Sequence, residues 1–244
     1  MNRLVLLTFA LCAPAALAAA AADPLVITIV GERDAEWGSY RQGYEAVHQF
    51  ERITRTRPLI QAHMQIQPLR EDVSLAGVEV ELAGETTRAP IALDGVGRAT
   101  IPMDRRAYDE DALLRLNRRK GNYRISGLFT IRERADGRYS VADLRAACDQ
   151  MLSAQREAGN RFTLWGKECA GVKFIYALDD SAATVAFDES GVARGTLAGA
   201  PEAPFTLPPI PTRYRVLTYR FADWPAAGVL LTSTPPLAIT AAYR

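Results

Sequence analysis

Short stretches in which apolar and polar residues alternate dominate the middle of the chain, from residue 59 to residue 134. Ile60, Ala62 and Met64, for example, alternate with polar neighbours, and turn dipeptides such as Asp94-Gly95 follow such stretches. A period of two places successive side chains on opposite faces of a strand. Several short strands separated by turns are typical of a sandwich. The pattern therefore predicts a β-sandwich-like domain over residues 59–138.

Two segments have the spacing of a helix instead, and a serine that can cap the helix precedes each of them. Tyr40 and Tyr44 lie four residues apart and predict a helix over about residues 40–53. A regular apolar stripe predicts a second helix over about residues 141–158, and its members are Leu144, Ala147, Cys148, Met151 and Leu152.

Strand patterns return after the second helix, and residues 198–211, rich in proline and alanine, are predicted to be an extended surface loop. The fold class is therefore expected to be mainly β (α+β), with a β-sandwich-like domain and a second β-rich part that carries one amphipathic helix. The expected organisation along the chain is a signal peptide over 1–22, a strand and helix over 23–58, the sandwich over 59–138, and a C-terminal helix with strands over 139–244.

The first residues have the order of a secretion signal: a basic residue, Arg3, then a short apolar stretch, then small residues that include Ala18. Cleavage is expected between Ala18 and Ala22. A membrane anchor is the alternative, but the apolar stretch is shorter than the roughly 20 residues that a span requires. A lipid attached at Cys12 is a second alternative, but Leu11 stands where a small residue is needed. The mature chain is expected to be periplasmic or secreted, with no membrane span.

The charge of the chain gives no reason to expect a nucleic-acid partner. The 244 residues include 29 basic and 28 acidic ones, and removal of Arg3 with the signal leaves 28 of each. A neutral chain lacks the electrostatic footprint of a nucleic-acid-binding protein. The specific partner stays unknown at this level, and another envelope protein or a glycan is the expected kind.

Two cysteines, Cys148 and Cys169, follow the expected cleavage site. Two thiols in an oxidising compartment most often pair, so we expect a disulfide between them. Cys148 lies on the apolar stripe of the second predicted helix, and glycines on both sides of Cys169 relax its loop. Two separate buried thiols are the alternative.

One stretch of the chain resembles a known family. The runs AGVEVELAG at 76–84 and LDGVGRATI at 93–101 combine an alternating strand with a glycine-ended turn before the next strand. They resemble the carboxypeptidase-regulatory-like β-sandwich modules of secreted proteins. Such modules are generally non-catalytic, so the resemblance implies a structural or adhesive role.

Motifs for catalysis or metal binding are not found in the sequence. His48 and His63 are the two histidines, and neither stands in a short-spaced ligand pattern. No catalytic residue, cofactor site or metal site is therefore assigned. Trp37, Tyr40 and Tyr44 are candidate ligand-contact aromatics, with packing of the first helix as the alternative for the two tyrosines.

These observations favour an exported, non-enzymatic envelope or secreted protein that binds or scaffolds another molecule. The alternative is a periplasmic hydrolase whose active site is assembled from residues distant in sequence. A pocket that joins His48 or His63 to a serine or a carboxylate would favour the hydrolase.

Overall fold

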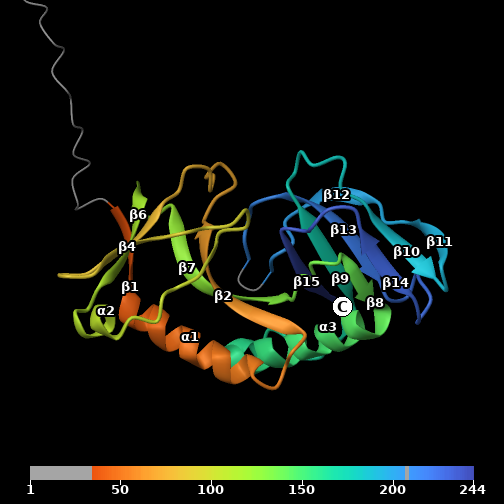
Figure 1. The fold of residues 1–244 in the computed structure, drawn as a ribbon, viewed down its shortest axis with the longest axis horizontal. Helices are drawn as coiled ribbons and strands as arrows, with labels where there is room; N and C mark the ends of the chain where they lie inside the picture. The colour runs from red at the N-terminus through yellow and green to blue at the C-terminus, as the bar shows by residue number, and fades with distance from the viewer. Residues whose placement is uncertain (1–34, 207–208) are drawn as a thin grey trace, which may run out of the picture. The chain divides into compact units, whose positions relative to one another are not determined.

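The computed structural model describes residues 35–206 and 209–244, and it confirms a mainly β, α+β fold (Figure 1). The signal peptide and the early strand predicted within residues 1–30 lie outside the described residues. In the part of the chain that is described, three antiparallel sheets are joined by α-helices and short turns.

The largest sheet has seven strands in the order β12-β13-β9-β15-β7-β2-β5. It takes strands from both sides of residue 138, the expected boundary between the sandwich and the C-terminal part, and β7 pairs with β15 across it. The strands are β2 (Ile60–Pro68), β5 (Arg98–Ala99), β7 (Tyr123–Ile131), β9 (Cys169–Tyr176), β12 (Gly199–Glu202), β13 (Tyr214–Arg220) and β15 (Ala238–Tyr243).

The two smaller sheets have four strands each. The first runs β1-β6-β3-β4, formed by β1 (Ala35–Ser39), β6 (Leu113–Arg119), β3 (Val80–Ala83) and β4 (Arg88–Ile91). The second runs β11-β10-β14-β8, formed by β11 (Val192–Thr196), β10 (Val185–Glu189), β14 (Val229–Thr232) and β8 (Arg138–Ser140). The helices are α1 (Tyr40–Thr54), α2 (Arg105–Asp109) and α3 (Val141–Gln155), and a π-turn η2 (Arg156–Asn160) follows α3.

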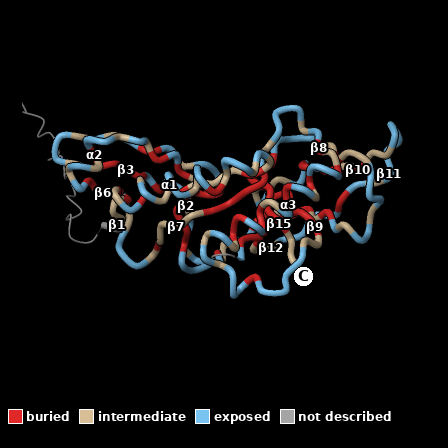
Figure 2. The backbone as a smooth tube through the Cα atoms, turned by 90° about the horizontal axis from the view of Figure 1, so that it is seen from below, coloured by how far each residue is buried: buried red, intermediate tan, exposed pale blue. Residues whose placement is uncertain are grey.

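One face of the seven-stranded sheet, here called the covered face, carries both long helices and the two smaller sheets (Figure 1). Its side chains alternate with those of the opposite face, as the period of two requires. On β2, Ile60, Met64 and Ile66 point to the covered face and are buried. In Figure 2, buried residues run along β2 through the middle of the fold.

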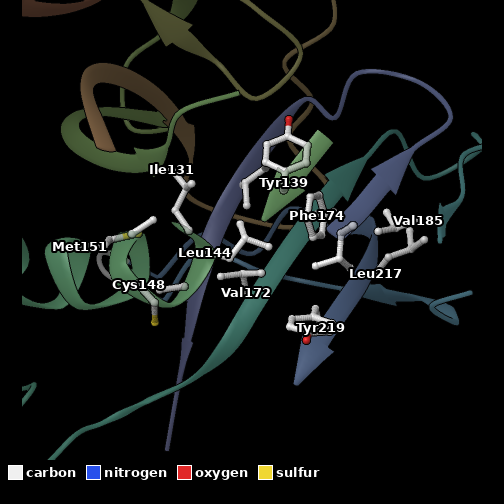
Figure 3. Close-up of a cluster of buried hydrophobic side chains, with 14 of the residues drawn as sticks. Ile131, Tyr139, Leu144, Cys148, Met151, Val172, Phe174, Val185, Leu217 and Tyr219 are labelled. Carbon is white, nitrogen blue, oxygen red and sulfur yellow. The ribbon is translucent and has the colours of Figure 1, made fainter. Parts of the chain in front are cut away.

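The covered face holds two hydrophobic clusters. Beside α1 and the first small sheet, Tyr40 packs with Leu82 and Leu114. Beside α3 and the second small sheet, buried aromatics pack with the apolar stripe of the helix, and Figure 3 shows Leu144 of α3 beside Val172 and Phe174. Burial of this much apolar surface is the main stabilising contribution to the fold.

Both predicted helices are present with their predicted serine caps. The hydroxyl of Ser39 accepts from the backbone N–H of Gln42, and that of Ser140 from the N–H of Asp143. The second helix ends at Gln155, three residues before the predicted end. The chain then turns through Gly159, whose φ of 106° is left-handed backbone that glycine tolerates best.

One local prediction is wrong. The segment 198–211 is not simply an extended surface loop, because Gly199–Glu202 forms the edge strand β12, and Phe205 and Ile210 are buried. Proline on an edge strand is tolerated because its missing N–H faces no partner strand.

The predicted disulfide between Cys148 and Cys169 is present, with the two Cα atoms 5.9 Å apart. Cys148 is fully buried on α3, and Cys169 begins β9. The bond therefore ties α3 to β9, an interior strand of the sheet.

Candidate binding groove

The other face of the seven-stranded sheet, here called the outer face, is covered only in part. Val96 from the turn before β5, and Phe205 and Ile210 from the segment after β12, pack onto Leu128 and Ile175. These contacts bury the middle of the face. Polar side chains occupy the rest of it, so this is where a ligand could reach the sheet.

A groove of about 780 Å³ is open at the end of the outer face where β9 begins. It is lined by the ends of β9, β13 and β15, by the loop after η2, and by the turn after β13. Its apolar lining includes Leu164, Phe221 and Tyr243, beside several alanines. We call it the cationic groove because its charged lining residues are Arg145, Lys167, Lys173, Arg220 and Arg244 against Glu202 and Asp223.

Three of these cations, Arg145, Lys167 and Arg220, have no ion-pair partner among the described residues. The ammonium of Lys173 is paired with the carboxylate of Glu202, and Arg244 pairs with Glu168 at 3.0 Å. Unpaired cations in one concave site create a positive potential that attracts an anion.

Arg145 has the most constrained position in the groove. It projects from α3, its Nη2 donates to the backbone oxygen of Phe221 at 2.9 Å, and its guanidinium lies 4.4 Å from the centre of the Phe221 ring. Its Nε is buried and has no hydrogen-bond partner within the described chain. A buried donor without a partner costs free energy, and a ligand oxygen would satisfy it.

A second polar cluster lies farther along the outer face, around Arg98. Its Nε contacts Asp94 Oδ2 at 2.5 Å, its Nη1 contacts Glu133 Oε1 at 2.6 Å, and its Nη2 donates to the backbone oxygen of Leu237 at 2.8 Å. Gln61 donates to the other oxygen of Glu133. Arg98 and both carboxylates are therefore already engaged, and the cluster joins β5 to the strands around it.

His63 lies beside this cluster and lines two small cavities, of about 380 Å³ and 170 Å³. Its Nε2 is buried without a hydrogen-bond partner among the residues described. Burial, with a smaller contribution from the positive charge of Arg98, lowers the pKa of His63 below 6.5. The imidazole is therefore neutral at pH 7 and available as a hydrogen-bonding group.

Of the three candidate aromatics, Tyr40 and Tyr44 have side chains among the described residues, and their rings lie 6.0 Å apart. The hydroxyl of Tyr40 donates to the backbone oxygen of Pro102 at 2.5 Å, and its side chain is fully buried. Tyr44 is half-buried, with its ring 4.9 Å from that of Tyr108 and 4.8 Å from that of His48. The backbone of Trp37 pairs with that of Arg115 in the first small sheet.

The sequence contained no signal for the cationic groove. Its lining residues come from α3, four strands and three loops, separated by up to about a hundred positions, and no short motif links them. The charge balance of the whole chain concealed the local excess of cations.

Comparisons with known proteins give no relative for this chain. No family model, no curated protein and no solved structure matches it. Within the described residues, no group of three or more histidine, cysteine, aspartate or glutamate side chains could hold a metal ion, and no helix could span a membrane.

Proposed function

We propose that this chain is an exported binding protein of the periplasm or the extracellular space, and that its cationic groove binds an anionic amphiphile. The observation that carries the proposal is the presence of Arg145 and Arg220 without ion-pair partners in a 780 Å³ concavity with an apolar wall. Arginine suits carboxylate and phosphate groups because its planar guanidinium can donate two parallel hydrogen bonds.

The chemistry of the lining supports an amphiphile over a simple anion. Leu164, Phe221 and Tyr243 border the same space as the cations. A ligand with an acidic head and an apolar tail would satisfy both sets of groups, since pockets combine apolar walls with a few placed polar groups. Export itself rests on the signal-like start of the sequence, and the Cys148–Cys169 disulfide fits an oxidising compartment.

Titration calorimetry with decyl phosphate, and with decyl glucoside as the uncharged match, tests the groove. Decyl phosphate should bind and decyl glucoside should bind at least tenfold more weakly. Arg220→Gln should weaken decyl phosphate binding by about tenfold, because one charge-assisted hydrogen bond contributes roughly 1.5 kcal/mol.

The matched control is Arg138→Gln, which removes an exposed arginine from β8, outside the groove. It should bind decyl phosphate as the native protein does. Equal binding of the two ligands, or equal effects of the two substitutions, would show that the cations of the groove do not select the ligand.

A periplasmic hydrolase is the second candidate, and His63 is the observation that favours it. His63, whose Nε2 has no partner, lines the cavity of about 380 Å³ that Asp94 and Glu133 also line. A neutral histidine in a cavity is a candidate general base. Hydrolysis of p-nitrophenyl esters and glycosides that His63→Ala abolishes would support this function, and hydrolysis unaffected by His63→Ala would exclude His63 as the base.

A further inference from the structure

The loop between η2 and β9 exposes two large aromatic side chains to solvent. Phe162 is 87% exposed and Trp165 is 78% exposed, more than any other large hydrophobic residue in the described chain. They stand three positions apart in residues 160–167, here called the aromatic loop. Exposed apolar groups gathered at one place are typical of an interaction site.

The aromatic loop has a defined conformation despite this exposure. Arg156 Nη2 donates to the backbone oxygens of Leu164 and Lys167, at 3.0 and 2.8 Å. The side chain of Leu164, between the two aromatics, is 2% exposed and anchors the loop. The disulfide at Cys169 fixes the end of the connection to β9. Phe162 and Trp165 are thus held outward by the fold around them.

The charges of the aromatic loop are of one sign. Arg161 and Lys167 are both exposed and have no ion-pair partner among the described residues, and residues 160–167 contain no carboxylate. Lys167 and Leu164 also line the cationic groove, so the aromatic loop is the rim of that groove. A tryptophan and a phenylalanine flanked by cations match the composition of segments that lie in the interface of an anionic bilayer.

We propose that the aromatic loop docks this protein on the surface of an anionic phospholipid bilayer. Phe162 and Trp165 insert at the level of the headgroups, and Arg161 and Lys167 contact the phosphates. The positive charges favour this occupant over a neutral glycan or an apolar protein surface, since a nearby lysine or arginine strengthens binding to anionic lipid about fivefold. Docking on a bilayer through the aromatic loop is a property separate from the binding of a ligand in the cationic groove.

Co-sedimentation of the mature protein with vesicles tests the proposal. Vesicles of phosphatidylglycerol and phosphatidylcholine in equal parts should bind the protein, and pure phosphatidylcholine vesicles should bind it at least tenfold more weakly. Phe162→Ser/Trp165→Ser should reduce binding to the anionic vesicles at least tenfold. Leu178→Ser/Val192→Ser is the matched control, since both side chains are 53% exposed elsewhere, and it should bind normally.

Arg161→Gln/Lys167→Gln should lower binding by about 25-fold and remove most of its dependence on salt. Arg220→Gln should weaken decyl phosphate binding about tenfold but should lower vesicle binding far less than Arg161→Gln/Lys167→Gln does, so failure of the groove and failure of the docking surface give different results. Absence of binding to anionic vesicles, or equal binding to neutral ones, would overturn the proposal. So would a dimer in solution that Phe162→Ser/Trp165→Ser dissociates, because the aromatics would then cover a second copy.

Discussion

The two faces of the seven-stranded sheet are built from the same strands, yet they have different roles. The covered face is apolar, and the rings of Phe174 and Tyr139, which Figure 3 shows side by side, are in edge contact with their centres 5.4 Å apart. The outer face carries Gln65, Gln67 and Lys173, and loops bury only its middle. Burial on the covered face stabilises the fold, and incomplete cover on the outer face leaves room for the cationic groove.

The polar side chains buried on the outer face are a further difference between the two faces. Gln65 and Gln67 are almost fully buried on the outer face, and each is hydrogen-bonded: Gln65 donates to the backbone oxygen of Val96 at 2.7 Å, and Gln67 donates to Gln65 at 2.8 Å. Arg124 then donates to Gln67 at 2.7 Å. Polar side chains can be buried without a large cost only when they are paired in this way. The Nε2 of His63 on this face and the Nε of Arg145, which reaches the groove from α3, have no such partner among the described residues, which makes both residues candidate ligand contacts.

The largest expected effect is on the covered face. Phe174→Ala should lower the free energy of unfolding by about 3–5 kcal/mol, because it removes a fully buried ring and leaves a cavity. Thr218→Ala changes a half-buried residue on the outer face of the neighbouring strand β13 and should cost less than about 0.5 kcal/mol. Urea denaturation measures both. Similar costs at the two positions would mean that the faces do not differ in the way described.

Sequence reasoning worked where a local pattern decided the structure. The apolar stripe around Leu144 and the serine caps placed both long helices. The disulfide was predicted because two thiols in an oxidising compartment most often pair, and because Cys148 lies on the apolar stripe of the second helix.

The pattern failed where contacts distant in sequence decided the structure. Alternation along β2 does not reveal that Gln65 is buried, because the turn that covers it comes thirty residues later. A segment rich in proline cannot be recognised as strand β12 until its partner β13 is known. The groove could not be predicted for the same reason, since Arg145 and Arg220 meet only in three dimensions.

Removal of the disulfide, which joins α3 on the covered face to β9, should have the second-largest effect on the free energy of unfolding. Cys169→Ser should lower the free energy of unfolding by about 3 kcal/mol, since the 21-residue separation leaves a loop of that size unconstrained in the unfolded chain. The melting temperature should fall by about 2–4 °C for each kcal/mol lost.

Treatment of the native protein with a reductant is the control and should produce the same loss. Cys169 begins β9, one of the strands that line the groove. Any loss of decyl phosphate binding on reduction should therefore come from a less rigid groove wall. Two freely alkylated thiols in the unreduced protein would contradict the bond.

The smallest expected effect is a pH dependence that comes from His63 on the outer face. Burial lowers its pKa below 6.5, and the positive charges of Arg98 and Arg132 lower it further, against the opposite effects of Glu133 and Asp94. Glu51 of α1 lines the smaller cavity as well. The unfolded chain therefore binds a proton at this histidine more readily than the folded chain does.

Because of this difference, the contribution of His63 to stability is complete above pH 6.5 and is lost as the pH falls toward the lower pKa of the folded state. The free energy of unfolding of the native protein should fall between pH 7 and pH 5 more steeply than that of His63→Gln, whose side chain stays neutral. Urea denaturation at several pH values measures the slopes. Equal slopes for the native protein and His63→Gln would mean that His63 is as well solvated in the folded protein as in the unfolded chain, and that the outer face is open to water at this point.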